Sequence, residues 1–337
     1  MRHRIILSVL LILVLASGVT PAMADVKVAT GEITKVEGGG KAVTIKTDSG
    51  QTIVSKMRAK RTEVFQGDKL ISFKDMRKGD RVWLTYRPGG KNEAGVIKVN
   101  PDLKSETELV KDKIARAVRI LNMEGLVAFS GHISARIPGG KTFFIHSYNQ
   151  ARGEVKPSDL CEVTLDGKQL NEKSEVPDET AIHAAVYRAR EDVNAVIHIH
   201  PHYIIIPSII GKDLIPVCGH GTIFGTKVPV YPDSEKIGTT EAANKMVKSL
   251  GKERAIVLRG HGAVLGEATI EAVVTSAFYM EENAKLLVDS YIMGTPIPMA
   301  EEEIKRAAEN TFQPFSTKKT WKYYIDKGRK AGIFWDK

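Results

Sequence analysis

The sequence is poor in cysteine and has no long apolar run beyond its N-terminus. Cys161 and Cys218 are the only cysteines in 337 residues, and nothing in the sequence brings the two thiols together. We therefore expect two buried free thiols. The one extended apolar run, residues 5–19, is short for a full membrane span. We expect no stable membrane insertion of the mature chain.

The N-terminus has the pattern of an export signal. Residues 2–4 form a basic head, residues 5–19 an apolar middle and residues 22–24 a small-residue cleavage site. Cleavage after Ala24 would give a periplasmic or secreted protein, and an uncleaved membrane anchor is the alternative. No cysteine lies near this site, which argues against a lipoprotein.

The excess of positive charge is confined to the N-terminal third. The chain carries 49 basic and 40 acidic residues, a net charge of +9. Residues 25–100 hold 16 basic and 9 acidic residues, whereas residues 101–337 hold 31 of each. Nucleic acid is therefore an unexpected partner for this exported chain. A solvated basic face explains the surplus in residues 25–100, with anionic envelope polymers or lipid head groups as the alternative.

The mature chain has two regions with different sequence patterns. Period-two runs lie at residues 31–36, 42–47, 52–54, 81–86 and 94–99. With glycine-rich turns between them, they predict a small all-β barrel over residues 25–100, loosely similar to exported OB-like domains. Helices are expected at 106–124, 239–250 and 269–291, and strands at 130–136, 143–147, 160–165, 195–200, 228–231 and 255–264. This alternation predicts a three-layer α/β domain over residues 101–300, followed by a helical tail over residues 301–337.

Three histidines lie on or beside predicted buried strands. Residues 195–200 read Ala-Val-Ile-His-Ile-His, a pattern typical of a buried strand. Because side chains two residues apart share a face, His198 and His200 project together, and a divalent metal would satisfy both imidazoles. His261 ends another apolar strand, 255–264, between two glycines that let the backbone approach a ligand. His202 is left out, because a proline interrupts the strand before it.

Glu179 lies in the predicted first turn of a helix that leads into the first of these strands. The helix dipole favours acidic residues in that position. One carboxylate and three imidazoles make a ligand set suited to a catalytic divalent cation. A single core histidine is more often only hydrogen-bonded, so the prediction depends on the four residues occurring together.

Several of these motifs resemble the class II aldolase/adducin family, which includes L-fuculose-1-phosphate aldolase and L-ribulose-5-phosphate 4-epimerase. The resemblance is carried by Glu179, the His198-X-His200 pair, the Gly-His261-Gly turn and the later helix at residues 279–284. It extends over about two-thirds of the chain. It implies a mixed, mostly antiparallel sheet, zinc or another divalent metal, and a homo-oligomer, commonly a tetramer, with sites at subunit interfaces.

The resemblance also implies roles. Glu179 would be a resting metal ligand and then a proton carrier, while the metal holds an enediolate or enolate after a carbon–carbon bond breaks. His183 lies four residues further along the same helix face. It either orients Glu179 or is a satisfied core histidine.

Departures from the sugar-phosphate aldolases change the expected substrate. In the turn Ser130-Gly131-His132, the histidine replaces the phosphate-binding asparagine of the family. Pro177 and Asp178 replace two small hydroxyl residues that help to hold phosphate, and an anionic Asp178 would repel it. The turn resembles family members that decarboxylate hydroxylated acids, in which a basic residue would meet a carboxylate.

The remaining site predictions follow from the same resemblance. His220 aligns with the catalytic tyrosine of the family, so His132, His220 and Arg136 are candidates for binding a carboxylate or donating a proton, with structural roles as the alternative. Residues 147–154 lie where relatives have a substrate loop. The predicted substrate-binding residues are Ser130, Gly131, His132 and Ser147, and the predicted catalytic residues are Glu179 and His220.

The sequence therefore predicts a metal-dependent carbon–carbon lyase, by aldol cleavage or decarboxylation, acting on a small hydroxy-carbonyl or hydroxy-carboxylate substrate. An epimerase or dehydratase on the same metal site is one alternative, although the epimerases carry aspartate in place of Glu179. An adducin-like scaffold or a periplasmic zinc-binding protein is the non-enzymatic alternative. Adducin-like relatives lose the metal ligands, and this chain keeps all four.

Overall fold

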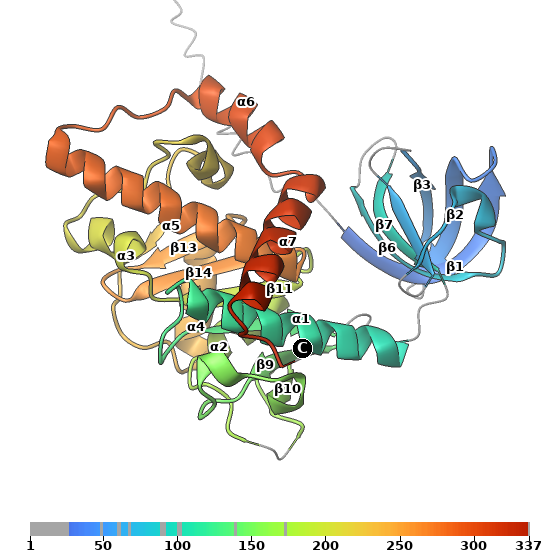
Figure 1. Ribbon diagram of the computed structural model, residues 1–337, viewed down its shortest axis with the longest axis horizontal. Helices are drawn as coiled ribbons and strands as arrows, with labels where there is room; N and C mark the ends of the chain where they lie inside the picture. Colours follow the sequence, from blue (N-terminus) through green and yellow to red (C-terminus); the bar gives the residue numbers. More distant parts are fainter. Residues whose placement is uncertain are drawn as a thin grey trace, which may run out of the picture.

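The computed structural model describes residues 27–47, 50–58, 62–66, 69–87, 92–99, 103–137, 140–171 and 174–335. The predicted leader, residues 1–24, lies outside these ranges. Across them the chain builds two sheets, one in the N-terminal third and one in the larger α/β part (Figure 1). None of the described helices combines the length and the apolarity needed to cross a bilayer.

The N-terminal part is a seven-stranded barrel. Its strands are β1 (Lys27–Glu37), β2 (Ala42–Thr47), β3 (Thr52–Lys56), β4 (Glu63–Gln66), β5 (Lys69–Leu70), β6 (Arg81–Arg87) and β7 (Glu93–Val99). The order is β3-β2-β1-β6-β7-β4-β5, and a further β3–β7 pairing closes the sheet. Alternate residues face inwards, so that Ile33, Ile45 and Leu84 are fully buried.

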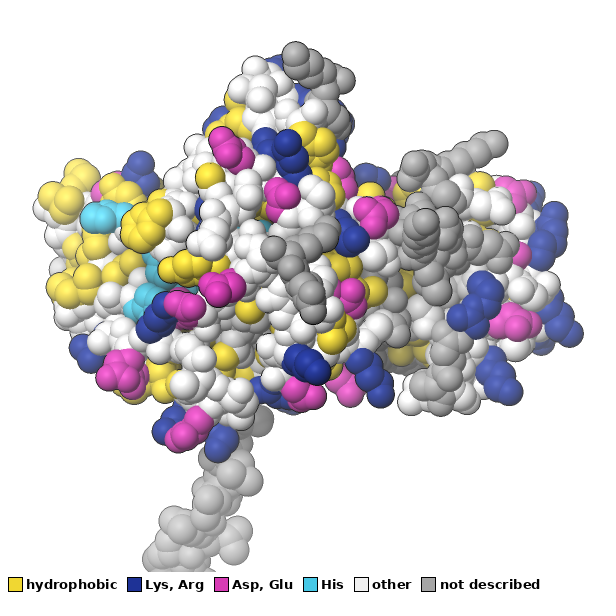
Figure 2. Space-filling view, turned by 90° about the horizontal axis from the view of Figure 1, so that it is seen from below, with side chains coloured by type: hydrophobic (Ala, Val, Ile, Leu, Met, Phe, Trp, Pro, Cys, Tyr) yellow, Lys and Arg dark blue, Asp and Glu magenta, His cyan; other side chains and the backbone are white. Residues whose placement is uncertain are grey.

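This barrel confirms the predicted small all-β part, and its likeness to OB domains stays a prediction. β4 and β5 were not predicted, because strands of four and two residues are too short to show a period of two. Figure 2 shows Lys and Arg side chains, in dark blue, over the barrel on the right of the view. Part of the basic surplus of residues 25–100 therefore lies on the face of the barrel seen in this view.

The second sheet carries the candidate site. Its strands are β8 (His132–Arg136), β9 (Thr142–His146), β10 (Leu160–Thr164), β11 (Ala195–Ile199), β12 (Val230–Tyr231), β13 (Ala255–Leu258) and β14 (Gly262–Glu267). The order is β10-β9-β8-β11-β14-β13-β12. All neighbours are antiparallel except β12 and β13. The predicted mixed, mostly antiparallel sheet is confirmed.

Helices cover both faces of this sheet (Figure 1). One face packs against α1 (Leu103–Met123), α3 (His202–Ile209), α5 (Ile270–Met293) and α7 (Pro314–Lys330), and the other against α2 (Thr180–Ala189) and α4 (Thr240–Leu250). Within β11, Ile197 belongs to the first core and Val196 to the second. This confirms the three layers, and it places His198 and His200 on the side of α2.

The C-terminal residues pack onto the α/β part. After α6 (Glu301–Thr311), helix α7 lies against α5 and α1. Ile120 of α1, Ile325 of α7 and Phe334 form one buried cluster. The predicted helical tail therefore adds to the core around α1.

Three predicted details are wrong. The single strand expected over residues 255–264 is divided into β13 and β14, because Gly260 has a φ of +66° and the N–H of His261 donates to the carbonyl of Leu258 in a tight turn. Helix α2 begins at Thr180, so Glu179 is its N-cap residue and does not lie in its first turn. Both cysteines are free as expected, but only Cys161 is buried.

Candidate functional site

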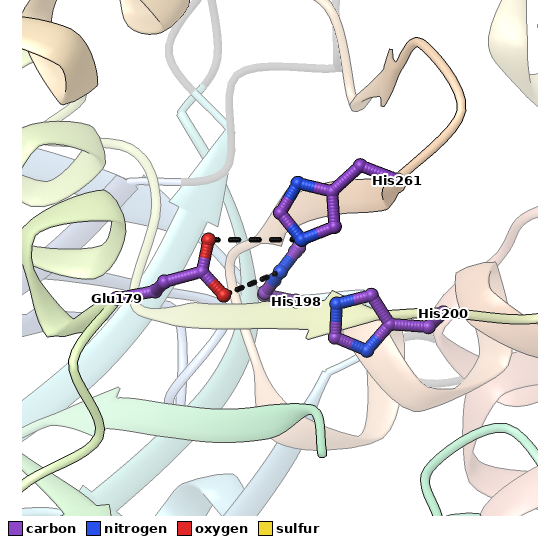
Figure 3. A group of neighbouring side chains, drawn as sticks. All are labelled: Glu179, His198, His200 and His261. Carbon is purple, nitrogen blue, oxygen red and sulfur yellow. Dashed lines mark ion pairs between the residues drawn. The ribbon is translucent and has the colours of Figure 1, made fainter. Parts of the chain in front are cut away.

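The four predicted metal ligands meet in one cluster. Glu179, His198, His200 and His261 each offer a ligand atom within 4.8 Å of the others. They come from the N-cap of α2, from β11, from the residue after β11 and from the β13–β14 turn. Figure 3 shows the carboxylate of Glu179 facing the rings of His198 and His261, with His200 beside them.

The ring of His198 is held so that one nitrogen faces the cluster. Its Nδ1 lies 3.0 Å from the carbonyl oxygen of Ala263 and donates to it, which leaves the lone pair on Nε2. This Nε2 is buried and forms no hydrogen bond with the described residues, although Glu179 Oε2 lies 3.3 Å away. An unsatisfied buried nitrogen beside a carboxylate is costly unless a cation lies between them. The donor set therefore fits a divalent metal.

Backbone geometry brings His261 to the same point. Its Nε2 lies 3.7 Å from Glu179 Oε1. The residue after it must be small, because a Cβ on Gly262 would lie 2.4 Å from the carbonyl oxygen of Ile199 and 2.8 Å from Cδ2 of His200. The glycine thus allows β14 to pack closely against the end of β11.

Glu179 is an ionised carboxylate in this setting. Its Oε1 accepts a hydrogen bond from the backbone N–H of Ile237 at 3.0 Å. Burial alone would raise its pKa, but the adjacent ring of His198, the N–H of Ile237 and the nearby His261 together lower the pKa to about 2. The group is therefore ready to bind a cation at neutral pH.

A cavity of about 710 Å³ adjoins the cluster. Its wall includes Ser130, Gly131, His132, Arg152, Glu179 and Lys236. Three of the four predicted substrate-binding residues thus face one space together with Glu179. The fourth, Ser147, is buried beside this wall, and its carbonyl lies 3.0 Å from His146 Nδ1.

His132 links the cavity to a buried row of polar groups. It pairs with His198 across β8 and β11, and the ring centroids lie 5.1 Å apart. Its Nδ1 is 2.7 Å from His183 Nε2, and His183 Nδ1 is 2.6 Å from Ser134 Oγ. Ser134 Oγ is in turn 2.7 Å from the hydroxyl of Tyr187. His183 is therefore a satisfied core histidine that bonds to His132, and the suggestion that it orients Glu179 is wrong.

The α/β part of the chain is similar in sequence to known proteins of one family. The sequence model described as "Class II Aldolase and Adducin N-terminal domain" matches residues 112–288. The chain belongs to the class II aldolase and adducin family. It is 28% identical over 228 residues to 3,4-dihydroxyphthalate decarboxylase of Arthrobacter keyseri, which covers 64% of this chain and 92% of that protein. It is 30% identical over 175 residues to L-fuculose phosphate aldolase of Methanocaldococcus jannaschii, covering 52% and 91% respectively.

Solved structures show the same fold. L-fuculose 1-phosphate aldolase from Glaciozyma antarctica superposes with a TM-score of 0.62 at 22% identity, over 70% of this chain and 94% of that one. An aldolase II superfamily protein from Pseudomonas syringae gives a TM-score of 0.61 at 24% identity, over 68% and 95%. The relatives named here are lyases of the class II aldolase family, and the cluster of Glu179 with three histidines is consistent with a metal-dependent lyase of that family.

In this member of the class II aldolase family, the surroundings of Arg136 and Asp178 differ from those that the sequence predicted. The guanidinium of Arg136 donates to the carbonyl oxygens of Val193, Tyr187 and Arg190 and lies over the ring of Tyr187. These carbonyls at the end of α2 fix it as a structural residue, so its candidacy for substrate binding is wrong. Asp178 forms an ion pair with Lys236 at the cavity. Its repulsion of phosphate is therefore weaker than its charge alone implies.

His220 lies apart from the cluster within one chain. It is the second residue of the short helix η4 (Gly219–Phe224). Its ring pairs with Glu282 at 2.6 Å and stacks on Tyr279 with ring centroids 3.9 Å apart. Its side chain is 40% exposed. Among the described residues it lines neither the metal cluster nor the cavity. A catalytic role for His220 stays a prediction, and it requires the site of a neighbouring subunit.

Sequence reasoning missed two cationic residues of the cavity, Arg152 and Lys236. The signal in the sequence is weak. Arg152 lies within residues 147–154, the predicted substrate loop, but no spacing distinguishes it from an exposed arginine. Lys236 is far from every motif in the sequence, and only the fold brings it to Glu179.

Ser130 supports a ligand ring in addition to facing the cavity. Its hydroxyl lies 3.1 Å from His200 Nδ1, which leaves Nε2 of that ring for the cation. Replacing a group that orients a metal ligand typically lowers affinity by about 10- to 100-fold. We expect this loss for Ser130→Ala, measured by competition with a zinc chelator. Ser249→Ala, on the exposed face of α4, is the control and should leave the affinity unchanged.

Proposed function

We propose that the protein is an exported, metal-dependent carbon–carbon lyase that works as a homo-oligomer with bound zinc. Its reaction is aldol cleavage or decarboxylation of a small hydroxy-carbonyl or hydroxy-carboxylate compound. The observation that carries the proposal is the cluster of Glu179, His198, His200 and His261, with the buried and unsatisfied Nε2 of His198. The aldolases and decarboxylases among the relatives support the reaction class.

The residues have distinct parts in this proposal. Three histidines and Glu179 would hold the cation. When bound, it would supply Lewis-acid stabilisation of the negative charge that develops on substrate oxygens as the bond breaks. Glu179 lies in both the cluster and the cavity wall, so its carboxylate can take a proton from the substrate and return it. His132 faces the same space and orients the substrate.

The intact cluster distinguishes this proposal from an adducin-like scaffold, and turnover distinguishes it from a zinc-binding protein. An adducin-like scaffold has no need of four convergent ligands beside a cavity. A periplasmic zinc-binding protein would have that need, and it predicts metal uptake without turnover. An epimerase or dehydratase would use the same cluster and differ in its product.

The test is a metal analysis of the purified protein followed by a screen of hydroxy-acids and hydroxy-aldehydes. We expect about one divalent ion per chain, because the four residues form one ligand set, and release of carbon dioxide or an aldehyde that stops after chelation. Turnover that survives complete removal of metal would contradict the proposal. Bound metal with no turnover across the screen would favour zinc binding alone. Cell fractionation and size-exclusion chromatography test export and assembly.

A further inference from the structure

Arg152 is a buried cation at the cavity that has no acidic partner. It is 6% exposed and begins the short helix η2 (Arg152–Glu154). Its Nε donates to the carbonyl of Gly131 at 3.0 Å, and its Nη1 donates to those of Gln150 at 2.6 Å and Tyr148 at 3.3 Å. In the described ranges no carboxylate forms an ion pair with it. Buried charges are normally paired with an opposite charge, so the cavity itself is the place for the missing anion.

Other arginines show the contrast. The buried Arg190 pairs with Asp192 at 2.7 Å, and the half-buried Arg254 pairs with Glu267 at 2.6 Å. Arg119, like Arg152, donates to backbone carbonyls, but it does not line the cavity. Arg152 thus combines burial, carbonyl-held orientation and access to the cavity. Because its three bonds use Nε and Nη1, its Nη2 remains for a ligand.

The row of polar groups behind His132 fixes a second donor. Tyr187 is buried, and the acceptor that the described residues offer to its O–H is Ser134 Oγ. If Tyr187 donates to Ser134, then Ser134 donates to His183 Nδ1, and His183 Nε2–H donates to His132 Nδ1. In the opposite direction the buried O–H of Tyr187 would have no acceptor, which costs free energy. The proton of His132 therefore lies on Nε2.

The Nε2–H of His132 and the Arg152 guanidinium are positioned by neighbouring residues of the chain, Gly131 and His132. The guanidinium is anchored to the carbonyl of Gly131, and His132 follows in the chain. Both side chains line the cavity, and His132 Nε2 forms no hydrogen bond with the part of the chain that the structure describes. We propose that Arg152 Nη2 and His132 Nε2 bind a carboxylate of the substrate. Two other oxygens of the substrate, on adjacent carbon atoms, then face the Glu179 cluster. This proposal rests on the proposed function and adds the substrate class.

A carboxylate suits this pair better than a phosphate does. Two N–H donors match its two oxygens, and a guanidinium is well shaped for a carboxylate. A phosphate offers more oxygens than these donors satisfy, and Lys236 is already paired with Asp178. The bound carboxylate is also the one that stays in the product, because its loss as neutral carbon dioxide would break the ion pair. A decarboxylated substrate would therefore carry a second carboxylate nearer to the metal cluster.

The test compares two ligands of zinc-loaded protein by titration calorimetry. Catechol and 3,4-dihydroxybenzoate share the adjacent hydroxyls and differ only in the carboxylate. A charge-assisted hydrogen-bonded pair predicts that the acid binds about 10- to 100-fold more tightly. Arg152→Gln should bring this ratio close to one without changing the Kd of catechol. Arg152→Lys keeps the charge and should retain part of the ratio. His132→Asn, at a separate position, should also reduce it.

Arg119→Gln is the matched control, because it removes a similarly buried, carbonyl-bound guanidinium away from the cavity. Its ratio should equal that of the wild type, with circular dichroism confirming that each variant folds. Equal binding of the two ligands by the wild type, or equal effects of Arg119→Gln and Arg152→Gln, would overturn the carboxylate site and leave the proposed lyase intact. A larger gain for dihydroxyacetone phosphate over dihydroxyacetone would assign the site to phosphate and overturn it as well. Binding of neither ligand by zinc-loaded protein would also overturn the carboxylate site, whereas the proposed function itself is contradicted by turnover that survives complete removal of metal.

Discussion

Glu179→Gln is expected to abolish most of the turnover while the metal stays bound. The three histidines remain, and the amide oxygen can still accept the N–H of Ile237. The amide cannot take up and return a proton, whereas the Glu179 carboxylate, with its pKa lowered to about 2 by His198 and its other neighbours against the effect of burial, is ionised. Loss of a positioned acid–base group typically costs about 10²- to 10⁴-fold in rate. The measurement is kcat beside the zinc content of the same sample.

Glu281→Gln is the matched control for this substitution. Glu281 is also a partly buried carboxyl group that accepts backbone N–H groups, from Tyr203 at 3.3 Å and Ile204 at 3.1 Å. It lies outside the metal cluster, so its kcat should stay near that of the wild type. If Glu179→Gln retained turnover at the level of Glu281→Gln, the carboxylate would not be the proton carrier.

The fold was largely predictable because its signals are local. The run Ala-Val-Ile-His-Ile-His shows burial and a period of two within six residues, and β11 occupies residues 195–199. The split between β13 and β14 was not predicted, because apolar residues lie on both sides of Gly260 and His261 and indicate one strand. Only the positive φ of Gly260 reveals the turn, and a glycine in a strand pattern can equally mark a bulge or a close approach of backbone.

The metal ligands were predictable for the same reason, as were Ser130, Gly131 and His132 of the cavity wall, whereas the long-range contacts of the cavity residues were not. His198 and His200 belong to one motif, and Glu179 and His261 each have a local marker. In contrast, the His132–His183 bond joins residues 51 positions apart, and the role of Arg152 depends on a carbonyl 21 positions away. Arg136 was wrongly predicted to contact the substrate, because nearby residues in the sequence line the site. Its guanidinium instead donates to the carbonyl oxygens at the end of α2.

His198→Ala is expected to remove both tight metal binding and the stabilisation that metal brings. His198 is fully buried, and its Nε2 faces the cluster with its ring fixed by Ala263. A cation that binds only the folded state adds about 4 kcal/mol at 1,000 times its Kd. The wild type should therefore unfold at a clearly higher temperature with zinc than with chelator, and His198→Ala should unfold at the same temperature in both.

His202→Ala separates the loss of a ligand from the loss of a histidine in this segment. His202 begins α3 on the exposed surface, four residues after His198, and it is absent from the cluster. Its substitution should preserve the zinc-dependent rise in unfolding temperature and the zinc content. If His198→Ala kept that rise, or if both variants lost it equally, zinc would be bound elsewhere, and the convergence of the four side chains would not mark a metal site. Because the rise is measured by unfolding, it tests the metal site without any knowledge of the substrate.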